Sequence, residues 1–307
     1  MMSHTEEDKE PTPQSHNAPA QRSSRSLLAV PTPIKQLFDI FPLLTYPVND
    51  LPQRAPQDRN KHVLYIFISE GGALKGLPSY NPACLKWQAY LKFSKIDFRI
   101  ASANNHASPS GALPFILPAS PEPYKHIQPV PSGKLQRWAM NNSKKAVEEP
   151  GDLRYEAYLS LLDHRIRRAW LYCIYLSHNS TSIAEPLYIL PSSGNPFVRL
   201  TIARELRTAA EKELLKFSPV INASTLYSQA EEAFAALETL LDKDDWFFGA
   251  PGPGLFDASV FAYTHLLLDE GLGKGWLDTR LRDALMSRKR LTSHRNRILS
   301  TYFPGQS

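Results

Sequence analysis

Residues 110–118 read SGALPFILP, and this short apolar run decides the fold. Four of its residues favour an extended strand, namely Leu113, Phe115, Ile116 and Leu117. Proline cannot donate a hydrogen bond to a central ladder, so it belongs at the beginning of a strand. We therefore predict that Pro114 opens a strand and that the Leu113–Pro114 bond is cis. The alternative is an ordinary loop proline before an ordinary strand.

The chain on either side of this run predicts an α/β domain. Residues 62–69 (HVLYIFIS) are apolar, as expected for a central strand covered on both faces. Residues 82–94 predict a half-buried helix, with Asn81 as its N-cap and a proline in its first turn. Its apolar arc comprises Ala83, Cys84, Trp87, Tyr90 and Leu91. The remaining predicted elements are strands at 97–101 and 124–130 and a helix at 133–140.

From residue 152 onward the apolar pattern becomes helical. Apolar residues recur at steps of three and four from Tyr155 to Cys173, which predicts one helix of about 25 residues. Further helices are predicted at 196–217, at 225–241 and from about residue 255, whereas 179–195 is predicted to be a loop. Asp257 follows Gly254 by three residues, which is capping-box spacing with glycine in place of Ser or Thr.

Composition and length set the domain organisation. Hydrophobic residues make up 42% of the chain and charged residues 21%, as in a folded globular protein. We predict a disordered tail at 1–25, a Pro-rich extended arm at 26–60, an α/β domain at 61–142 and a helical domain at 152–300. The arm is apolar around Phe38 and Phe41 and is expected to pack on its own fold or on a partner.

Charge and cysteine content limit the compartment and the kinds of partner that the chain is expected to have. Two cysteines, Cys84 and Cys173, cannot form a disulfide framework, which favours a reducing compartment. A net charge of +5 weakly favours an anionic surface or partner and is too small to indicate nucleic acid. No apolar run reaches the roughly 18–20 residues that span a bilayer. The acidic start, MMSHTEEDKE, resembles neither a signal peptide nor a transit peptide.

Two stretches carry a family resemblance. An α/β half followed by a helical half resembles the glutathione-transferase fold, a thioredoxin-like α/β domain plus an all-α domain. WFFGAPGPGLFDASVFAYTHLL (246–267) is similar to its C-terminal signature, a Phe-Gly loop before a capped helix with Asp257 in its first turn. Within that superfamily, NPACLKWQAYLKFSKIDFRIASANNHASPSGALPFILP (81–118) resembles metaxins and the Sam35 and Sam37 subunits of the mitochondrial sorting and assembly machinery.

The resemblance implies a function. The arm and the lack of a spanning segment look more like Sam35 than Sam37. We therefore expect a non-enzymatic, peripheral subunit on the cytosolic face of the mitochondrial outer membrane, meeting the membrane surface only indirectly. The implied partners are a Sam50-like outer-membrane β-barrel, a Sam37/metaxin-like subunit and β-barrel precursors, whose β-signal the protein would help to recognise.

The main alternative is a glutathione-dependent transferase. Such an enzyme needs a thiolate-stabilising side chain at a helix N-terminus after the first strand, and Ser79, Tyr80 and Cys84 lie there. Cys84 falls on the predicted buried arc, however, which favours packing. The insertion GGALKGLPSY departs from the compact enzyme loop, and residues 131–133 lack the acidic residue that glutathione-binding members carry. We expect no catalytic residue and no cofactor.

Other chemistry is not indicated. The histidines show no metal-ligand spacing, and no catalytic triad or phosphate-binding loop stands out. A soluble redox or scaffolding protein unrelated to membranes is a third alternative.

Eight residues remain as candidates for structure or contact. Pro114, Trp87 and Asp257 are predicted to be structural. The candidate partner or signal contacts are Phe38 and Phe41 in the arm, Leu74 in a glycine-rich loop at 71–79, and Arg288 and Arg290 in a basic segment at 280–297. That segment is interpreted either as a contact for anionic headgroups or acidic partners, or as a solvated last helix.

Overall fold

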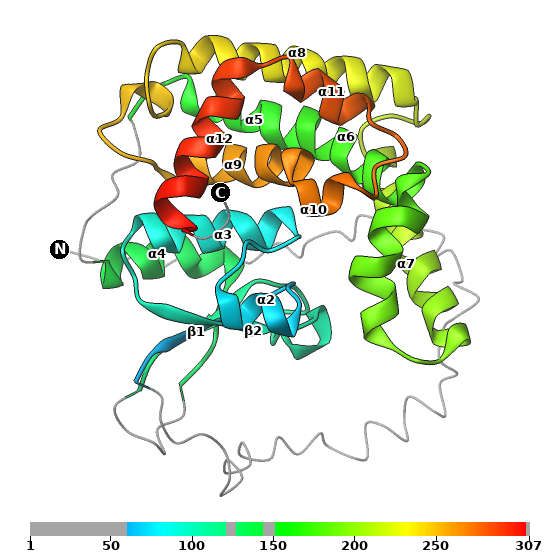
Figure 1. The fold of residues 1–307 in the computed structure, drawn as a ribbon, viewed down its shortest axis with the longest axis horizontal. Helices are drawn as coiled ribbons and strands as arrows, with labels where there is room; N and C mark the ends of the chain where they lie inside the picture. The colour runs from blue at the N-terminus through cyan, green and yellow to red at the C-terminus, as the bar shows by residue number, and fades with distance from the viewer. Residues whose placement is uncertain (1–59, 121–126, 144–150, 305–307) are drawn as a thin grey trace, which may run out of the picture. The chain divides into compact units, whose positions relative to one another are not determined.

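The computed structural model describes residues 60–120, 127–143 and 151–304 (Figure 1). The predicted tail and, up to residue 59, the predicted arm with Phe38 and Phe41 lie outside the described residues. Residues 124–126 of the strand predicted at 124–130 also lie outside them, and of its four described residues only Val130 belongs to a strand. All the described residues fall within one compact unit, so the α/β part and the helical part are packed against each other.

A four-stranded sheet in the order β2-β1-β3-β4 forms the first part. β1 (His62–Ile66) lies parallel to β2 (Phe98–Ser102) and antiparallel to β3 (Phe115–Leu117), and β3 is antiparallel to β4 (Val130–Pro131). The Leu113–Pro114 bond is cis and directly precedes β3, as predicted. The sheet thus has the expected thioredoxin-like order.

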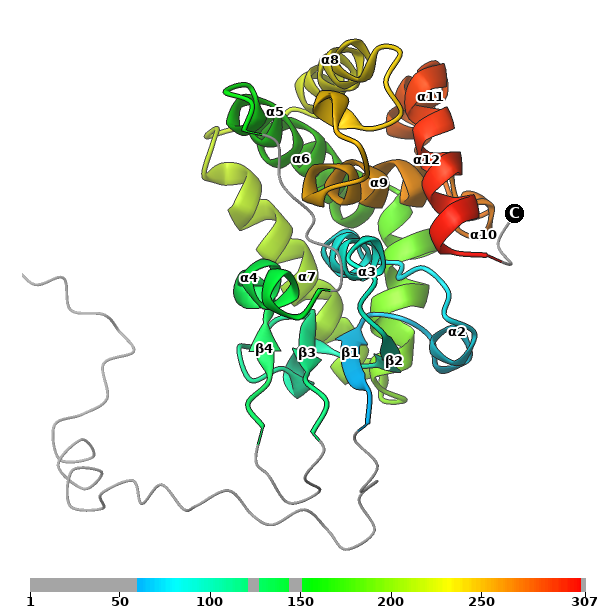
Figure 2. The same ribbon diagram turned by 90° about the vertical axis from the view of Figure 1, so that its left-hand side faces the viewer.

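Side chains alternate across the sheet. Leu64 and Ile66 are fully buried on the face that carries α3 (Pro82–Phe93) and α4 (Ser132–Asn142). On the other face Tyr65 stacks on Phe115 with ring centroids 4.5 Å apart, in the register that pairs the two residues. Figure 2 shows both helices over one face of the sheet.

Both edges of the sheet are protected against strand addition. β4 is short and contains Pro131, which cannot donate to a further strand. β2 is flanked by α2 (Glu70–Lys75), a helix where the sequence predicted a glycine-rich loop (Figure 2). Two caps stabilise this helix despite its glycines: Gly72 N donates to Ser69 Oγ at 3.1 Å, and Gly76 ends it in the left-handed conformation at φ 69°.

α3 is buried on more of its surface than the sequence indicated. It packs on the sheet and, on its other side, on α9 (Leu255–Leu268) of the helical part. Ala83, predicted on the buried arc, is exposed, and Trp87 is only half-buried, with its ring edge-on to Tyr90 at 5.8 Å. The apolar arc of a helix in one sequence predicts a single packing face. It does not predict a second face that packs on residues far away in the chain.

The helical part begins with one continuous helix, as predicted. It contains α5 (Tyr155–Leu161), α6 (Arg167–Leu171) and two wider π-helical stretches, η2 (Leu162–Ile166) and η3 (Tyr172–Leu176). The loop predicted at 179–195 is instead mostly helical, as η4 (Ser180–Ile189) and η5 (Leu190–Ser192). Its polar and proline content favoured a loop, but Ile183, Ala184 and Ile189 are buried, and their packing holds the segment in helical turns.

The remaining helices surround α9. Their bounds are η1 (Asn105–Ala107), α7 (Pro196–Leu215), α8 (Ala223–Leu241), η6 (Phe247–Gly249), α10 (Glu270–Gly273), α11 (Arg280–Met286) and α12 (Lys289–Tyr302). α9 is buried along most of its length. Within the described ranges, every helix is too short or too polar to cross a membrane.

Candidate functional site

The start of α3 is the place in this fold where an anionic ligand would meet a helix N-terminus. Ser79, proposed as the nucleophile-stabilising group of a transferase, is fully buried there. Its Oγ donates to Phe67 O at 2.6 Å and accepts from Asn81 N at 3.2 Å. The hydroxyl is therefore engaged by the backbone on both sides of the turn.

A residue that the sequence reading missed holds the same turn. Gln88 is fully buried on α3, where its Oε1 accepts from Ser79 N at 2.9 Å and its Nε2 donates to Leu77 O at 2.7 Å. Both ends of the amide thus fix the segment between α2 and α3. A polar residue within the buried surface of a helix is the signal that could have identified it.

Neither Cys84 nor Tyr80 is poised as an anion. Burial raises the pKa of the fully buried Cys84 thiol to about 12. Burial, followed by the nearby Cys84, also raises the pKa of the half-buried Tyr80 to about 12. A cysteine that acts as a thiolate at neutral pH needs a lowered pKa, so the shift at Cys84 runs against catalysis by that thiol.

Tyr188 covers the start of α3 from the helical half. It projects from η4, and its hydroxyl accepts from Asn81 Nδ2 at 3.2 Å and donates to Tyr80 O at 3.3 Å. Its ring packs edge-on against the rings of Phe67 and Tyr80, each with centroids 5.3 Å apart. Asn81 also caps α3 by accepting from Cys84 N at 3.2 Å. The side chains of Asn81 and Tyr188 thus bind each other and the nearby backbone rather than a ligand.

The start of α4 is the second place where a glutathione-binding relative would need an acidic side chain. Pro131 occupies the N-cap position and makes no side-chain cap, and the first turn contains no acidic residue. This geometry agrees with the missing acid in the sequence at 131–133.

The two cysteines give a test of this arrangement. Cys173, like Cys84, is buried and has its pKa raised by burial to about 12, so at pH 8 only about one thiol in ten thousand is ionised. We expect no fast reaction of the folded protein with a disulfide reagent and two reactive thiols after unfolding. Unfolded thiols ionise near their ordinary pKa of 9.0, whereas the buried thiols stay protonated. The free energy of unfolding should therefore fall as pH rises from 9 towards 12. A native thiol that reacts at the unfolded rate would contradict the buried placement.

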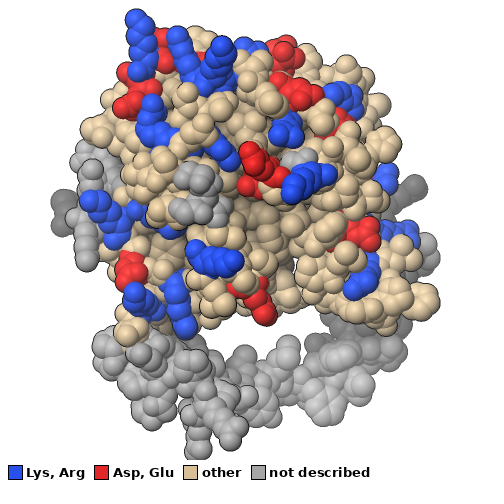
Figure 3. All heavy atoms as spheres, in the orientation of Figure 1, with Lys and Arg blue, Asp and Glu red and all other residues tan. Residues whose placement is uncertain are grey.

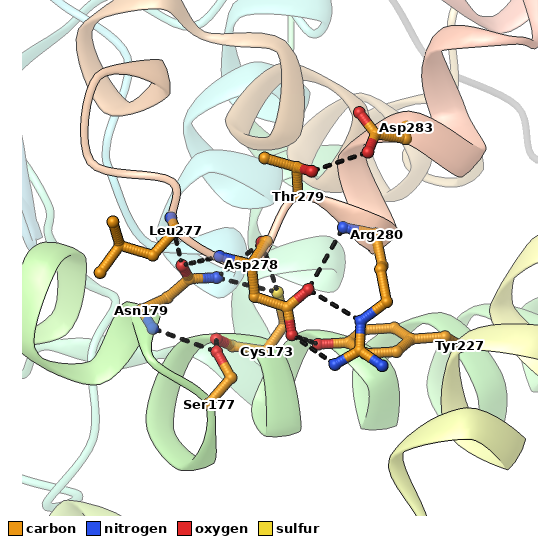
Figure 4. Close-up of polar contacts among 9 residues, drawn as sticks. All are labelled: Cys173, Ser177, Asn179, Tyr227, Leu277, Asp278, Thr279, Arg280 and Asp283. Atoms are coloured by element: carbon orange, nitrogen blue, oxygen red, sulfur yellow. Dashed lines mark hydrogen bonds and ion pairs between the residues drawn. The ribbon is translucent and has the colours of Figure 1, made fainter.

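A second polar cluster joins η3 to the segment before α11 (Figure 4). Asn179 is fully buried, and its Oδ1 accepts from the backbone N–H groups of Leu277 and Asp278, both at 2.9 Å. Its Nδ2 donates to Asp278 O at 3.0 Å and to Cys173 Sγ at 3.2 Å. Both the oxygen and the nitrogen of the side-chain amide are hydrogen-bonded within the chain, so we interpret the cluster as structural.

The Asp278 side chain extends this cluster to the surface. It accepts from Tyr227 Oη at 2.8 Å and from Arg280 Nη2 at 2.7 Å, and the Arg280 guanidinium lies 4.3 Å from the centre of the Tyr227 ring (Figure 4). The Arg280 hydrogen bonds hold the pKa of Asp278 below its ordinary value. The carboxylate stays charged and paired, with no position left for a reacting group.

Asp257 forms a third buried cluster, at the start of α9. Its Oδ2 accepts from Gly254 N at 3.0 Å, which is half of a capping box because glycine has no side chain to return the bond. Its Oδ1 accepts from Phe247 N at 3.1 Å and lies 2.9 Å from His294 Nε2 of α12. One carboxylate therefore connects the Phe-Gly loop, α9 and α12.

The basic segment at 280–297 is largely paired within the chain. Arg288 lies 3.8 Å from Glu238, and Arg290 lies 2.7 Å from Asp242. Arg297 contacts Asp245 at 2.7 Å. Acids of α8 and of the loop after it thus pair with these three arginines. The sequence had suggested such cations as contacts for anionic headgroups or acidic partners. In the described part of the chain, no three His, Cys, Asp or Glu side chains are arranged to hold a metal ion.

Comparisons with known proteins agree with the fold. The glutathione S-transferase N-terminal domain family matches residues 82–180, and the glutathione S-transferase C-terminal domain family matches residues 230–298. Metaxin-1 of Homo sapiens is 27% identical over 258 residues, which cover 78% of this chain and 51% of the human protein. Metaxin-1 of Macaca fascicularis is 26% identical over 250 residues, covering 78% and 75%. The chain thus spans about half the length of the human relative.

Solved structures resemble the chain at a lower level. Glutaredoxin 2 of Salmonella typhimurium, solved with glutathione, has a TM-score of 0.49 at 14% identity and covers 80% of this chain and 97% of its own. A glutathione transferase family member of Pseudomonas fluorescens, solved with two glutathiones, has a TM-score of 0.47 at 11% identity and covers 80% and 91%. The fold assignment itself rests on the strand order and on the two family matches.

Proposed function

We propose that this chain, a metaxin-like member of the glutathione-transferase-like superfamily, is a non-enzymatic subunit of a mitochondrial outer-membrane complex that assembles β-barrel proteins. The observation that carries the non-enzymatic part is Tyr188, which covers the N-terminus of α3 and binds the groups that would otherwise meet a ligand. The raised pKa of the Cys84 thiol supports the same proposal.

The finer role follows from the resemblance to Sam35. The protein would sit peripherally on the cytosolic face, bind a Sam50-like barrel and a Sam37/metaxin-like subunit, and help to recognise the β-signal of barrel precursors. A precursor strand exposes unpaired backbone groups until its barrel closes. Because both edges of the sheet are protected in the described residues, we place recognition in side-chain contacts rather than in strand addition to this sheet.

Co-purification tests this function. From mitochondria opened with mild detergent, the tagged chain should retain an outer-membrane barrel protein and a second metaxin-like protein, and both should survive washing in moderate salt. The same preparation should show no retention on immobilised glutathione and no conjugation of a standard electrophile. Glutathione turnover that Cys84→Ala abolishes in a folded protein would favour the transferase instead. Recovery of the chain without any membrane protein would contradict the proposed assembly.

A further inference from the structure

Positive charge is concentrated in the α/β part of the described chain. From residue 151 to 304 there are 18 Lys and Arg residues against 18 Asp and Glu residues. The described residues from 60 to 143 carry eight basic side chains against two acidic ones, Glu70 and Asp97. The basic residues are Lys61, Lys75, Lys86, Lys92, Lys95, Arg99, Lys134 and Arg137. The helical part is neutral overall, so the net charge of the described residues belongs to the α/β part.

Four of these cations lie along the β2 edge of the sheet. Lys61 precedes β1 and contacts Asp97, just before β2, at 2.9 Å. Lys95 occupies the turn between α3 and β2, and Arg99 lies within β2. Lys75 is in the last turn of α2, which flanks β2, and Ser102 Oγ at the far end of β2 donates to Ile68 O just before α2. All four cations are exposed, and Figure 3 shows basic side chains over this part of the surface, with acidic ones between them.

Three of the four cations lack an acidic partner. In the described residues, Lys75, Lys95 and Arg99 make no ion pair, whereas Lys61 is paired with Asp97. In the basic segment at 280–297, by comparison, Arg288, Arg290 and Arg297 contact acids of their own chain. Cations without an internal partner remain available to an external anion.

An apolar side chain projects from the same edge. Leu74 on α2 is 91% exposed, more than any other large apolar side chain of the α/β part that the structure describes. It immediately precedes Lys75. An exposed leucine beside unpaired cations is the pattern of a surface that touches the boundary between lipid headgroups and acyl chains.

We infer that Leu74, Lys75, Lys95 and Arg99, here called the β2-edge patch, contact the anionic headgroups of a phospholipid membrane. The inference deepens the proposed function and rests on it, because it states which face of a peripheral subunit lies against the membrane. Each basic residue close to an anionic surface strengthens binding about fivefold. The three cations and the leucine together give weak, reversible adsorption that a barrel partner would then reinforce.

Vesicle binding of the purified full-length chain tests the patch. The chain should co-sediment with phosphatidylcholine vesicles that contain phosphatidylserine, and not with phosphatidylcholine alone. High salt should release it, because headgroup attraction is screened. The triple variant Lys75→Glu, Lys95→Glu, Arg99→Glu should lower the apparent affinity by about a hundredfold or more. Leu74→Ser should weaken binding severalfold without removing its salt dependence.

A matched charge reversal controls for net charge. Arg204→Glu, Lys212→Glu and Lys243→Glu change three exposed cations of the helical part. If the patch is the contact, this control should keep most of the vesicle binding. Equal loss in the two triple variants, or no loss in the patch variant, would overturn the inference. So would binding to soluble polyglutamate with none to vesicles, which would identify an acidic protein as the partner.

The outcomes separate this inference from the proposed function. Retention of the barrel and the second metaxin-like protein without vesicle binding would overturn the patch alone. Vesicle binding without either protein partner would overturn the assembly role and leave the patch supported.

Discussion

Asp257→Ala should destabilise the protein by about 3–5 kcal/mol, because it removes three buried hydrogen bonds at once. The carboxylate is 2% exposed and serves Gly254 N, Phe247 N and His294 Nε2. An ordinary helix cap contributes about 1 kcal/mol. The cost is larger here because two backbone N–H groups and one imidazole would be left buried without an acceptor. The free energy of unfolding from urea titration measures it.

Asp283→Ala is the matched control for this substitution. Asp283 also lies in the first turn of a helix and accepts from Thr279 Oγ1 at 2.7 Å, but it is exposed. Its loss should therefore cost less than about 1 kcal/mol, since water replaces the lost bond. If the two alanine variants unfolded at the same denaturant concentration, the three buried bonds would contribute nothing beyond an exposed cap.

Local patterns in the sequence predicted the frame of the fold. Pro114 before an apolar run predicted a strand opened by a cis bond, and the structure has both features. The spacing from Gly254 to Asp257 predicted the backbone bond between them. His294, the third partner of Asp257, lies 37 residues further along the chain, where no local pattern connects the two.

Two helical segments, α2 and η4, were predicted as loops. α2 contains two adjacent glycines, which are poor helix formers, although Ser69 and Gly76 are recognisable caps. η4 contains Ser, Thr and Pro, which favour a loop, but its apolar residues are buried against other helices. Because η4 was predicted as a loop, Tyr188 and its cover over α3 were missed.

The charges of α12 show the same limit. Arg288 and Arg290 stand in a basic run, which on its own indicates an anion-binding surface. Their partners Glu238 and Asp242 come from α8 and its end, about fifty residues earlier. Only the packing of α12 beside α8 reveals that these two arginines are paired within the chain.

Asn179→Ala should have a comparable effect, lowering the free energy of unfolding by about 3–5 kcal/mol. The amide accepts from the N–H groups of Leu277 and Asp278 and donates to Asp278 O and Cys173 Sγ. Alanine would take the acceptor away from a buried donor, Asp278 N, and a part-buried one, Leu277 N, would remove the donor to Asp278 O, and would open a small cavity. Amide hydrogen exchange adds a local readout, because protection at Leu277 and Asp278 should fall more than protection in α9.

Asn222→Ala is the control with the same chemical change. Asn222 is exposed, and its Oδ1 caps α8 by accepting from Thr225 N at 3.1 Å, so its loss should cost only about 1 kcal/mol. Asn179→Asp separates the two halves of the buried amide. It keeps the two accepted bonds, but it turns a donor that faced Asp278 O into a negatively charged oxygen. That variant should also be strongly destabilised at neutral pH and should recover stability as the introduced carboxylate is protonated at lower pH. The two alanine variants could instead be equally stable, with protection at Leu277 and Asp278 unchanged. That result would show that the Asn179 amide does not hold the segment before α11 in place.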